Sequence, residues 1–216
     1  MPDKKQDVSS QEALAILKKG NEHFVSGVVF YPPIGAERRS AVVTGGQHPC
    51  AVIVGCSDSR VPLEVLFNAG IGDIFVVRVA GNVCATDEIG SVEYAIGHLG
   101  VPLCVVLGHS HCLAVTNVLT GAEVGGSIPQ LSTPIVPVVE RVKAAYPGVP
   151  PVDLLSQAVE ANVWQGLENL LRGSETVRRA VAAGSAEVIG AVYDLLSGKV
   201  EWLGAHPEQE ALLQQA

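Results

Sequence analysis

The chain has 216 residues, of which 48% are hydrophobic, and its 22 acidic and 14 basic residues give a net charge of −8. This length and apolar content suit a single α/β domain, and the acidic balance without any Lys/Arg block argues against a nucleic-acid partner. No apolar stretch approaches the roughly 20 residues of a membrane span and no signal-peptide pattern opens the chain, so we expect a cytoplasmic protein without membrane contact.

The first 46 residues predict a helix followed by an arm. Ser9 and Glu12 have the spacing of a capping box, and the apolar residues that follow recur at helical spacing. Residues 28–46 contain two adjacent prolines and a Gly-Gly pair, which predict an extended arm or loop. Such an arm often wraps a partner subunit, so we separate residues 1–46 from an α/β core at 47–216.

Three β-branched runs open this core: "CAVIVG" at 50–55, "DIFVVRVAG" at 73–81 and "LCVVLG" at 103–108. Continuous apolar runs that alternate with helical segments predict a parallel sheet covered by helices. The clearest connecting helix is expected at 86–100, with Thr86 as its N-cap.

The C-terminal half continues the α/β pattern. Residues 121–151 are rich in Gly and Pro and give no clear prediction, whereas helices are expected around 153–171 and 174–183. The segment "AEVIGAVYDLLSGKVEWLG" then predicts a hairpin with its turn at 197–198. The predicted fold is a single α/β domain with a mainly parallel sheet, an N-terminal helical arm and a C-terminal hairpin.

Candidate metal ligands follow two of the predicted strands. Cys56 follows the first strand, and His109 and Cys112 follow the third, so all three lie where open α/β sheets build their sites. The His-x-x-Cys spacing predicts that its two members share one face of a helix's first turn. Two thiolates and one imidazole suit Zn²⁺, and an odd count of five cysteines favours metal or catalytic thiols over disulfides. We therefore expect one zinc ion per chain.

Two charged residues follow the first of these ligands. Asp58 and Arg60 stand two and four residues after Cys56. Taken alone, they are a salt bridge that closes a loop. Beside a metal ligand, they are interpreted as a functional dyad.

Several motifs together carry a family resemblance. "CSDSR" at 56–60, "VVRVAGN" at 76–82 and "GHSHC" at 108–112 resemble motifs of the β-class carbonic anhydrases, and the similarity extends over about residues 10–204. The resemblance implies a zinc-dependent lyase that reversibly hydrates CO₂ to bicarbonate and a proton by means of zinc-bound hydroxide. It also implies a homodimer or homotetramer.

Carried over residue by residue, the resemblance makes Cys56, His109 and Cys112 the zinc ligands. It gives Asp58 two possible tasks beside the metal. Paired with Arg60, Asp58 would orient the zinc-bound hydroxide toward CO₂; released from Arg60, it would bind zinc as a fourth ligand and displace that hydroxide.

The resemblance also assigns a pocket for CO₂ and bicarbonate to Gln47, Phe75 and Tyr94. Taken singly, the two aromatic residues are more often core and the glutamine a solvated loop residue. Two positions depart from the family pattern: Ala80 replaces the usual valine, and Leu113 stands where glycine is most frequent. Because these changes affect access to the metal, hydrolysis of COS or CS₂ remains an alternative. A non-catalytic zinc or bicarbonate-binding module is a second alternative, against which the retained dyad argues.

A regulated subgroup of the family has tryptophan at the position of Ile53, which argues against an allosteric bicarbonate site here. Its partner positions, Arg78 and Tyr193, are then interpreted as a strand-end ion pair and a half-buried sheet tyrosine. His111 lies between two ligands and is interpreted as a surface residue, with proton transfer as the alternative. The cysteines outside the predicted site are interpreted as core or loop thiols: Cys50, Cys84 and Cys104.

Overall fold

The computed structural model describes residues 8–27 and 32–214, and its centre is a five-stranded sheet of order β2-β1-β3-β4-β5. The first four strands in this order are parallel, and β5 pairs antiparallel with β4. The predicted mainly parallel α/β sheet with a C-terminal hairpin is therefore confirmed. The strands are β1 (Ala51–Gly55), β2 (Ile74–Arg78), β3 (Leu103–His109), β4 (Glu187–Tyr193) and β5 (Val200–Gly204).

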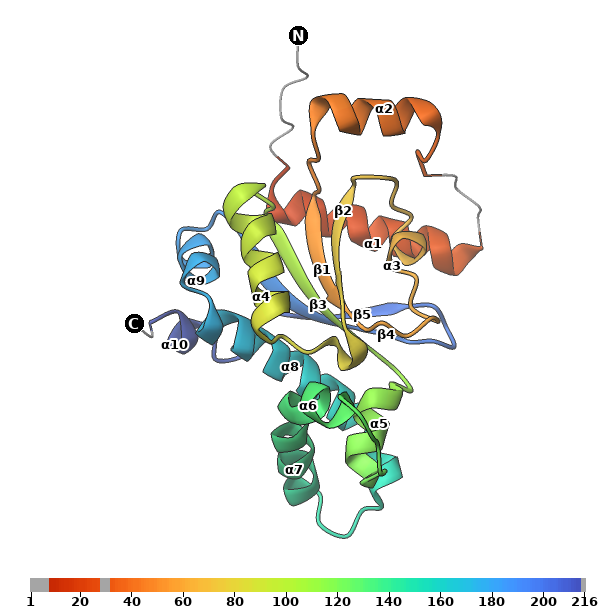
Figure 1. Cartoon of the computed structure of the whole chain (residues 1–216), viewed down its shortest axis with the longest axis vertical. Helices are drawn as coiled ribbons and strands as arrows, with labels where there is room; N and C mark the ends of the chain where they lie inside the picture. Colours follow the sequence, from red (N-terminus) through yellow and green to blue (C-terminus); the bar gives the residue numbers. More distant parts are fainter. Residues whose placement is uncertain (1–7, 28–31, 215–216) are drawn as a thin grey trace.

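Helices cover both faces of this sheet (Figure 1). The α-helices in the described part of the chain are α1 (Ser10–Ser26), α2 (Ala36–Gly45), α3 (Leu63–Leu66), α4 (Thr86–Glu93), α5 (Leu113–Thr120), α6 (Ile128–Ser132), α7 (Val136–Ala145), α8 (Leu155–Gly173), α9 (Glu175–Ala182) and α10 (Gln209–Leu213). Short helices add η1 (Ala80–Asn82), the π-helical η2 (Tyr94–His98), η3 (Thr133–Ile135) and η4 (Pro151–Leu154).

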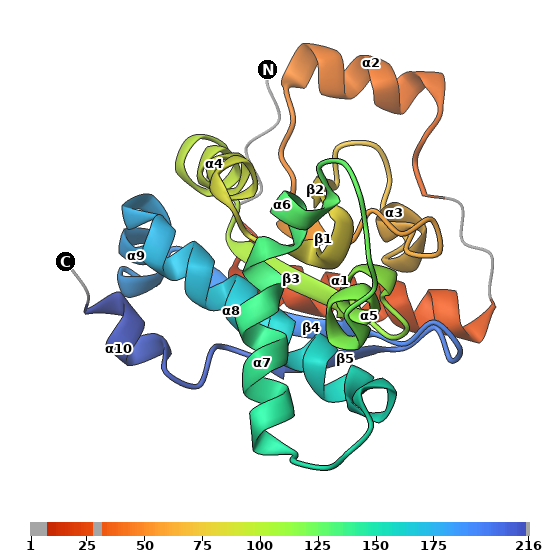
Figure 2. The same cartoon turned by 60° about the horizontal axis from the view of Figure 1, so that its bottom comes forward.

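The central strands are buried along their whole length because both sheet faces are covered. Every residue of β1 and β3 is buried, as expected for the continuous apolar runs of a parallel sheet. One face packs against α1 and α3, and the other against α4, α8 and α9 (Figures 1 and 2). A third apolar cluster lies beyond the carboxyl ends of β1 and β3, where α5, α7 and α8 meet. This third cluster supports the candidate site.

Helix α1 is fixed to the sheet by close backbone contact and by a buried amide. Its capping box, Ser9 with Glu12, is present as predicted. Gly20 faces the carbonyl oxygen of Phe67, where no side chain fits. Asn21 donates to the carbonyl of Gly198 and accepts from the amide of Val200, each at 2.9 Å, so that α1 holds the hairpin turn and the start of β5.

Two local predictions are wrong. The expected extended arm at 28–46 contains helix α2, none of whose residues is buried; residues 28–31 lie outside the described part of the chain. The N-cap of α4 is Ala85 and not Thr86, because the Glu88 carboxylate accepts the Ala85 amide at 3.1 Å and replaces a side-chain cap. Within 8–27 and 32–214, no helix has the length and apolar content needed to cross a membrane.

Candidate metal centre

Cys56, His109 and Cys112 come together at the carboxyl edge of the sheet. Their ligand atoms all lie within 4.8 Å of one another, and all three residues are buried. The register explains this, because β1 and β3 are neighbours and Gly55, just before Cys56, pairs with Leu107. Because the two strands are neighbours, the residues that follow them lie side by side, as the prediction of a shared site requires.

The path from His109 to Cys112 differs from the predicted helical turn. His109 is the last residue of β3, and Cys112 is the N-cap of α5. Between them His111 has φ 56°, a left-handed conformation that turns the chain sharply. The two ligands are therefore brought together by a tight strand-to-helix turn and do not share a helix face.

The imidazole of His109 is oriented by the backbone. Its Nδ1 lies 2.9 Å from the carbonyl oxygen of Ser110, so Nδ1 carries the proton and Nε2 keeps its lone pair. Nε2 is buried and has no hydrogen-bond partner among the described residues. A buried imidazole nitrogen that faces two sulfur atoms without a partner fits a metal ligand.

The two cysteine sulfur atoms lie within hydrogen-bond distance of each other. Cys56 Sγ and Cys112 Sγ are 4.0 Å apart, and the amide of Gly81 donates to Cys56 Sγ at 3.2 Å. The hydrogen bond from Cys112, supported by the amide of Gly81, lowers the pKa of Cys56 against the effect of burial. The same bond and burial raise the pKa of Cys112. One thiolate, one thiol and one imidazole form a donor set that fits Zn²⁺ once the remaining proton is lost.

Asp58 and Arg60 form a two-pronged ion pair beside the cluster. Arg60 donates from Nε to Asp58 Oδ1 at 2.9 Å and from Nη2 to Oδ2 at 2.6 Å, and its own amide also donates to Oδ1. These side-chain hydrogen bonds hold the pKa of Asp58 well below its usual range. Asp58 Oδ2 lies 3.9 Å from His109 Nε2, so the carboxylate borders the cluster while Arg60 holds it. Its role as a fourth ligand stays a prediction.

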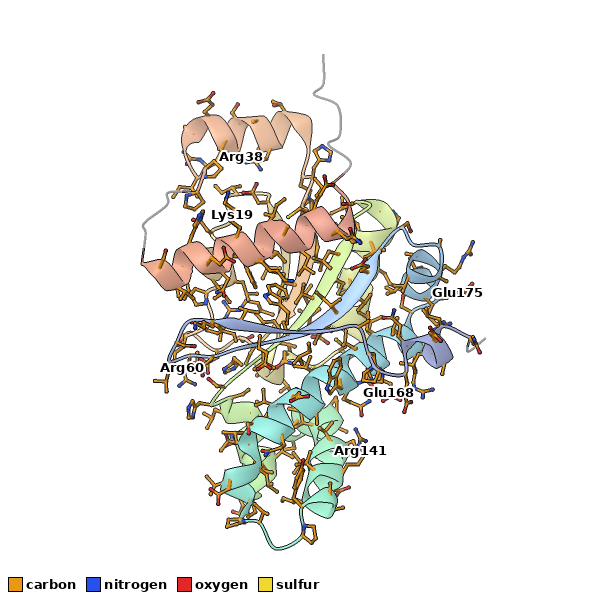
Figure 3. The ribbon with its side chains drawn as sticks, turned by 180° about the vertical axis from the view of Figure 1, so that it is seen from behind. Lys19, Arg38, Arg60, Arg141, Glu168 and Glu175 are labelled. Atoms are coloured by element: carbon orange, nitrogen blue, oxygen red, sulfur yellow. The ribbon has the colours of Figure 1, made fainter. Side chains whose placement is uncertain are left out.

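Arg60 also connects the two halves of the site. Its Nη2 donates to the carbonyl of His111 at 3.2 Å, which ties the loop after β1 to the turn after β3. The side chain is 52% exposed and lies at the hairpin end of the sheet (Figure 3).

Arg78 is a site residue that the sequence interpretation missed. It donates from Nε to the carbonyl of Cys56 at 3.0 Å and from Nη2 to the carbonyl of Asp58 at 2.7 Å. The predicted ion pair is thus wrong, because its partners are backbone oxygens. The only sequence signal was its place at the end of β2, where register sets it opposite Gly55.

The predicted pocket residues lie away from this cluster within one chain. Phe75 pairs in register with Val52, four residues before Cys56, which is roughly 13 Å along a strand. Tyr94 is 50% exposed, with its ring centroid 6.4 Å from that of Phe75. Gln47 is exposed before β1. The two aromatic residues contact each other, and neither they nor Gln47 reach the chain's own metal cluster.

The departures from the family pattern have distinct surroundings. Leu113 follows Cys112 directly and is 63% exposed, and Ala80 is half-buried in η1.

Ile53 is fully buried in the strand interior. Tyr193 is buried rather than half-buried, and its ring packs edge-on against Phe24. Of the remaining thiols, Cys84 and Cys104 are buried and Cys50 is half-buried.

The fold and site define an α/β protein with a Cys-His-Cys metal centre at the carboxyl edge of a mainly parallel sheet. Residues 51–200 match the family model described as carbonic anhydrase. The chain is 41% identical over 191 residues to a carbonic anhydrase of Mycolicibacterium smegmatis, covering 86% of this chain and 89% of the relative. It is 39% identical over 188 residues to carbonic anhydrase 2 of Mycobacterium tuberculosis, covering 85% and 87%.

Solved structures agree with these relatives. The β-carbonic anhydrase CafA of Aspergillus fumigatus superposes with a TM-score of 0.74 at 28% identity, covering 94% of each chain. A structure from a study of two tetrameric β-carbonic anhydrases of Sordaria macrospora has a TM-score of 0.68 at 28% identity, covering 79% of this chain and 88% of that one. The chain therefore belongs to the β-class carbonic anhydrases.

Proposed function

We propose that this protein catalyses the zinc-dependent, reversible hydration of CO₂ to bicarbonate and a proton. The observation that carries the proposal is the buried Cys56–His109–Cys112 cluster with the Asp58–Arg60 pair at its border. The relatives that share most of its length are named carbonic anhydrases, which supports the same reaction here.

The protein's own residues have separable tasks in this reaction. Cys56, His109 and Cys112 would hold the zinc ion, which when bound supplies the Lewis acidity that makes water a nucleophile near neutral pH. Asp58, kept ionised by Arg60, accepts a hydrogen bond from the attacking water and directs its lone pair toward the CO₂ carbon. Arg78 holds the backbone of Cys56 and Asp58 so that ligand and acceptor keep a fixed spacing.

The substrate pocket and the oligomer belong to one proposal. Gln47, Phe75 and Tyr94 lie on exposed or half-buried surface away from their own cluster. We infer that the chain forms a homodimer or homotetramer in which these residues border the metal centre of a second copy. The exposed helix α2 supports this, since it offers surface that its own domain does not use. A division into residues 1–46 and 47–216 and a cytoplasmic location stay predictions.

Two alternatives are less well supported. Hydrolysis of COS or CS₂ would use the same donor set, and its support is limited to two departures from the family pattern, the exposed Leu113 beside Cys112 and the half-buried Ala80. A non-catalytic zinc module has no need of a carboxylate held beside the metal by two hydrogen bonds from one arginine. CO₂ hydration uses this carboxylate as the acceptor that orients the attacking water.

Metal analysis and stopped-flow CO₂ hydration test the proposal together. We expect one zinc ion per chain in the parent and loss of most zinc in Cys112→Ser, with activity lost in proportion. Sulfide release from COS is measured on the same sample. A zinc-loaded parent that hydrates no CO₂, or that turns over COS faster, would contradict the proposed reaction. Full zinc occupancy in Cys112→Ser would contradict the ligand assignment.

A further inference from the structure

A buried asparagine on α8 connects to the metal centre through one glycine of η1. The amide of Gly81 donates to Cys56 Sγ at 3.2 Å, and the carbonyl of the same residue accepts from Asn162 Nδ2 at 2.8 Å. We propose that Asn162 is a positioning residue for the Cys56 thiolate, which it holds by fixing the backbone of Gly81.

The Gly81–Asn82 backbone turns sharply at the point where it contacts Cys56. Gly81 has φ 77°, and Asn82, the next residue, has φ 44°, so two consecutive residues occupy the left-handed region. Non-glycine residues adopt this region rarely and at some cost in energy. With its amide bound to a sulfur atom and its carbonyl to Asn162, Gly81 is held on both sides of its α-carbon. This fixes the direction in which its N–H points.

Helix α8 is shaped to bring the asparagine to η1. Gly166 lies one turn after Asn162 on the same face of α8, where a Cβ would stand 3.7 Å from the carbonyl oxygen of Asn82 and 3.0 Å from Val106 Cγ1. The absence of a side chain there lets the helix pack closely against β3, beside η1. The same helix packs Val163 against Gly108, just before the ligand His109. One helix thus contacts the backbone beside two of the proposed ligands.

The residue type also indicates a specific task. Asparagine is a poor helix former, and Asn162 is only 3% exposed in the middle of a 19-residue helix. An apolar residue would suit the helix and its core better. A buried amide at this position is explained by its bond to Gly81, since without it the Gly81 carbonyl would lose its observed side-chain donor.

The expected consequence concerns the metal, because hydrogen bonds to a ligand sulfur set its position and its electron donation. This inference rests on zinc binding by Cys56, His109 and Cys112. In Asn162→Ala, we expect zinc affinity, measured by chelator competition, to fall by about 10- to 100-fold, as is typical when a partner of a metal ligand is removed. In the Co²⁺-substituted protein, the sulfur-to-cobalt charge-transfer band should shift relative to the parent.

Two matched variants on α8 separate positioning from general stability. Asn169→Ala makes the same chemical change two turns further on, where the side chain accepts a hydrogen bond from Gln165. Leu170→Ala creates a cavity at a fully buried position that contributes to the core. Both should keep the zinc affinity and the Co²⁺ spectrum of the parent. Asn162→Asp keeps the side-chain volume but offers no donor when ionised, and should weaken zinc binding as Asn162→Ala does.

The outcomes are distinguishable. A parent that binds no zinc contradicts the proposed function itself. A parent that binds zinc, with folded Asn162→Ala or Asn162→Asp that matches its affinity and Co²⁺ spectrum, overturns only the role of Asn162. If neither variant folds, hydrogen exchange in the zinc-loaded parent decides: a Gly81 amide bound to sulfur should exchange among the slowest, and rapid exchange at that amide overturns the proposal.

Discussion

Asp58 lies between two possible tasks, and its contacts with Arg60 favour one of them. Arg60 donates three hydrogen bonds to the carboxylate, two from its guanidinium and one from its own amide. The guanidinium in turn donates to the carbonyl of His111, which fixes it to the opposite ligand loop. A carboxylate held in this way is available as an acceptor and is prevented from closing on the metal. Arg60 therefore controls which of the two tasks Asp58 performs.

The first prediction follows from this control. In Arg60→Ala, Asp58 loses the partner that holds it beside the cluster, so CO₂ hydration should fall by about 100-fold or more while zinc content stays at one per chain. Stopped-flow hydration and metal analysis on the same sample measure both. Arg172→Ala is the control, because Arg172 is similarly exposed and pairs with Glu168 at 2.7 Å on α8, away from Arg60 (Figure 3). An Arg60→Ala enzyme as fast as the parent would show that the Asp58–Arg60 pair is only a salt bridge that closes a turn.

The second prediction concerns the proton of the Cys112 thiol. The contact between the two sulfur atoms lowers the pKa of Cys56 and raises that of Cys112, so Cys112 is the thiol that holds its proton more tightly. Zinc binding must remove this proton, so zinc affinity should rise with pH, by about tenfold per unit between pH 7 and 8.5. Proton release on zinc addition to weakly buffered metal-free protein, together with chelator competition across this range, measures the effect. An affinity independent of pH would show that both thiols are ionised before the metal arrives.

At the scale of elements, the sequence predicted the structure correctly where a clear hydrophobic pattern marks a strand and the rules of sheet topology place its end. Buried apolar runs predicted β1 and β3, and the rule that parallel strands end at one edge predicted that Cys56 and His109 meet. What it missed depends on backbone geometry. The left-handed turn at His111 and the bonds from Arg78 to backbone carbonyls leave no trace in residue type.

Helix α2 was predicted wrongly for a different reason, because local sequence signals indicated a loop where the structure has a helix. Flanking Pro and Gly residues favoured an extended arm, but they mark the boundaries of α2 and do not enter its middle. The helix has no buried residue and little amphipathic pattern, so the usual signal of an apolar face is absent. Its contact with the domain includes polar bonds: Arg38 donates to Asp73 at 2.6 Å and to the carbonyl of Ile71.

The third prediction tests how closely α1 must approach the sheet. A Cβ at Gly20 would overlap the backbone carbonyl of Phe67, so Gly20→Ala should lower the free energy of unfolding by about 1–3 kcal/mol despite its better helix propensity. Gly90→Ala in α4 is the matched control, because no atom lies within 4 Å of a Cβ there. It should raise the same free energy by about 0.5–1 kcal/mol. Chemical denaturation measures both, and equal stability in the two variants would contradict the contact.

At the scale of the whole molecule, two features indicate an oligomer: the exposed surface of α2, and the distance between the predicted pocket residues and the metal cluster. Helix α2 stands off the sheet at one end of the molecule (Figure 1), and the aromatic pair of Phe75 and Tyr94 contributes half-exposed rings near the edge strand β2. The carboxyl edge of the sheet holds the metal cluster but none of these side chains. A second copy would bring the aromatic pair of one chain to the metal cluster of the other and cover α2. Loss of the oligomer should therefore also remove the substrate pocket.

The last prediction tests this link with a charge placed on α2. Val43 is 81% exposed on this helix, and Leu196 is 88% exposed at the tip of the β4–β5 hairpin. If α2 packs against a second copy, Val43→Glu buries an unpaired carboxylate in the interface and should weaken self-association at least about tenfold. Leu196→Glu adds the same charge elsewhere and should leave association unchanged. Sedimentation over a concentration series, with CO₂ hydration measured at each concentration, follows both properties. We expect activity to decline as Val43→Glu dissociates; a fully active monomer of the parent at micromolar concentration would refute both the interface and the shared pocket.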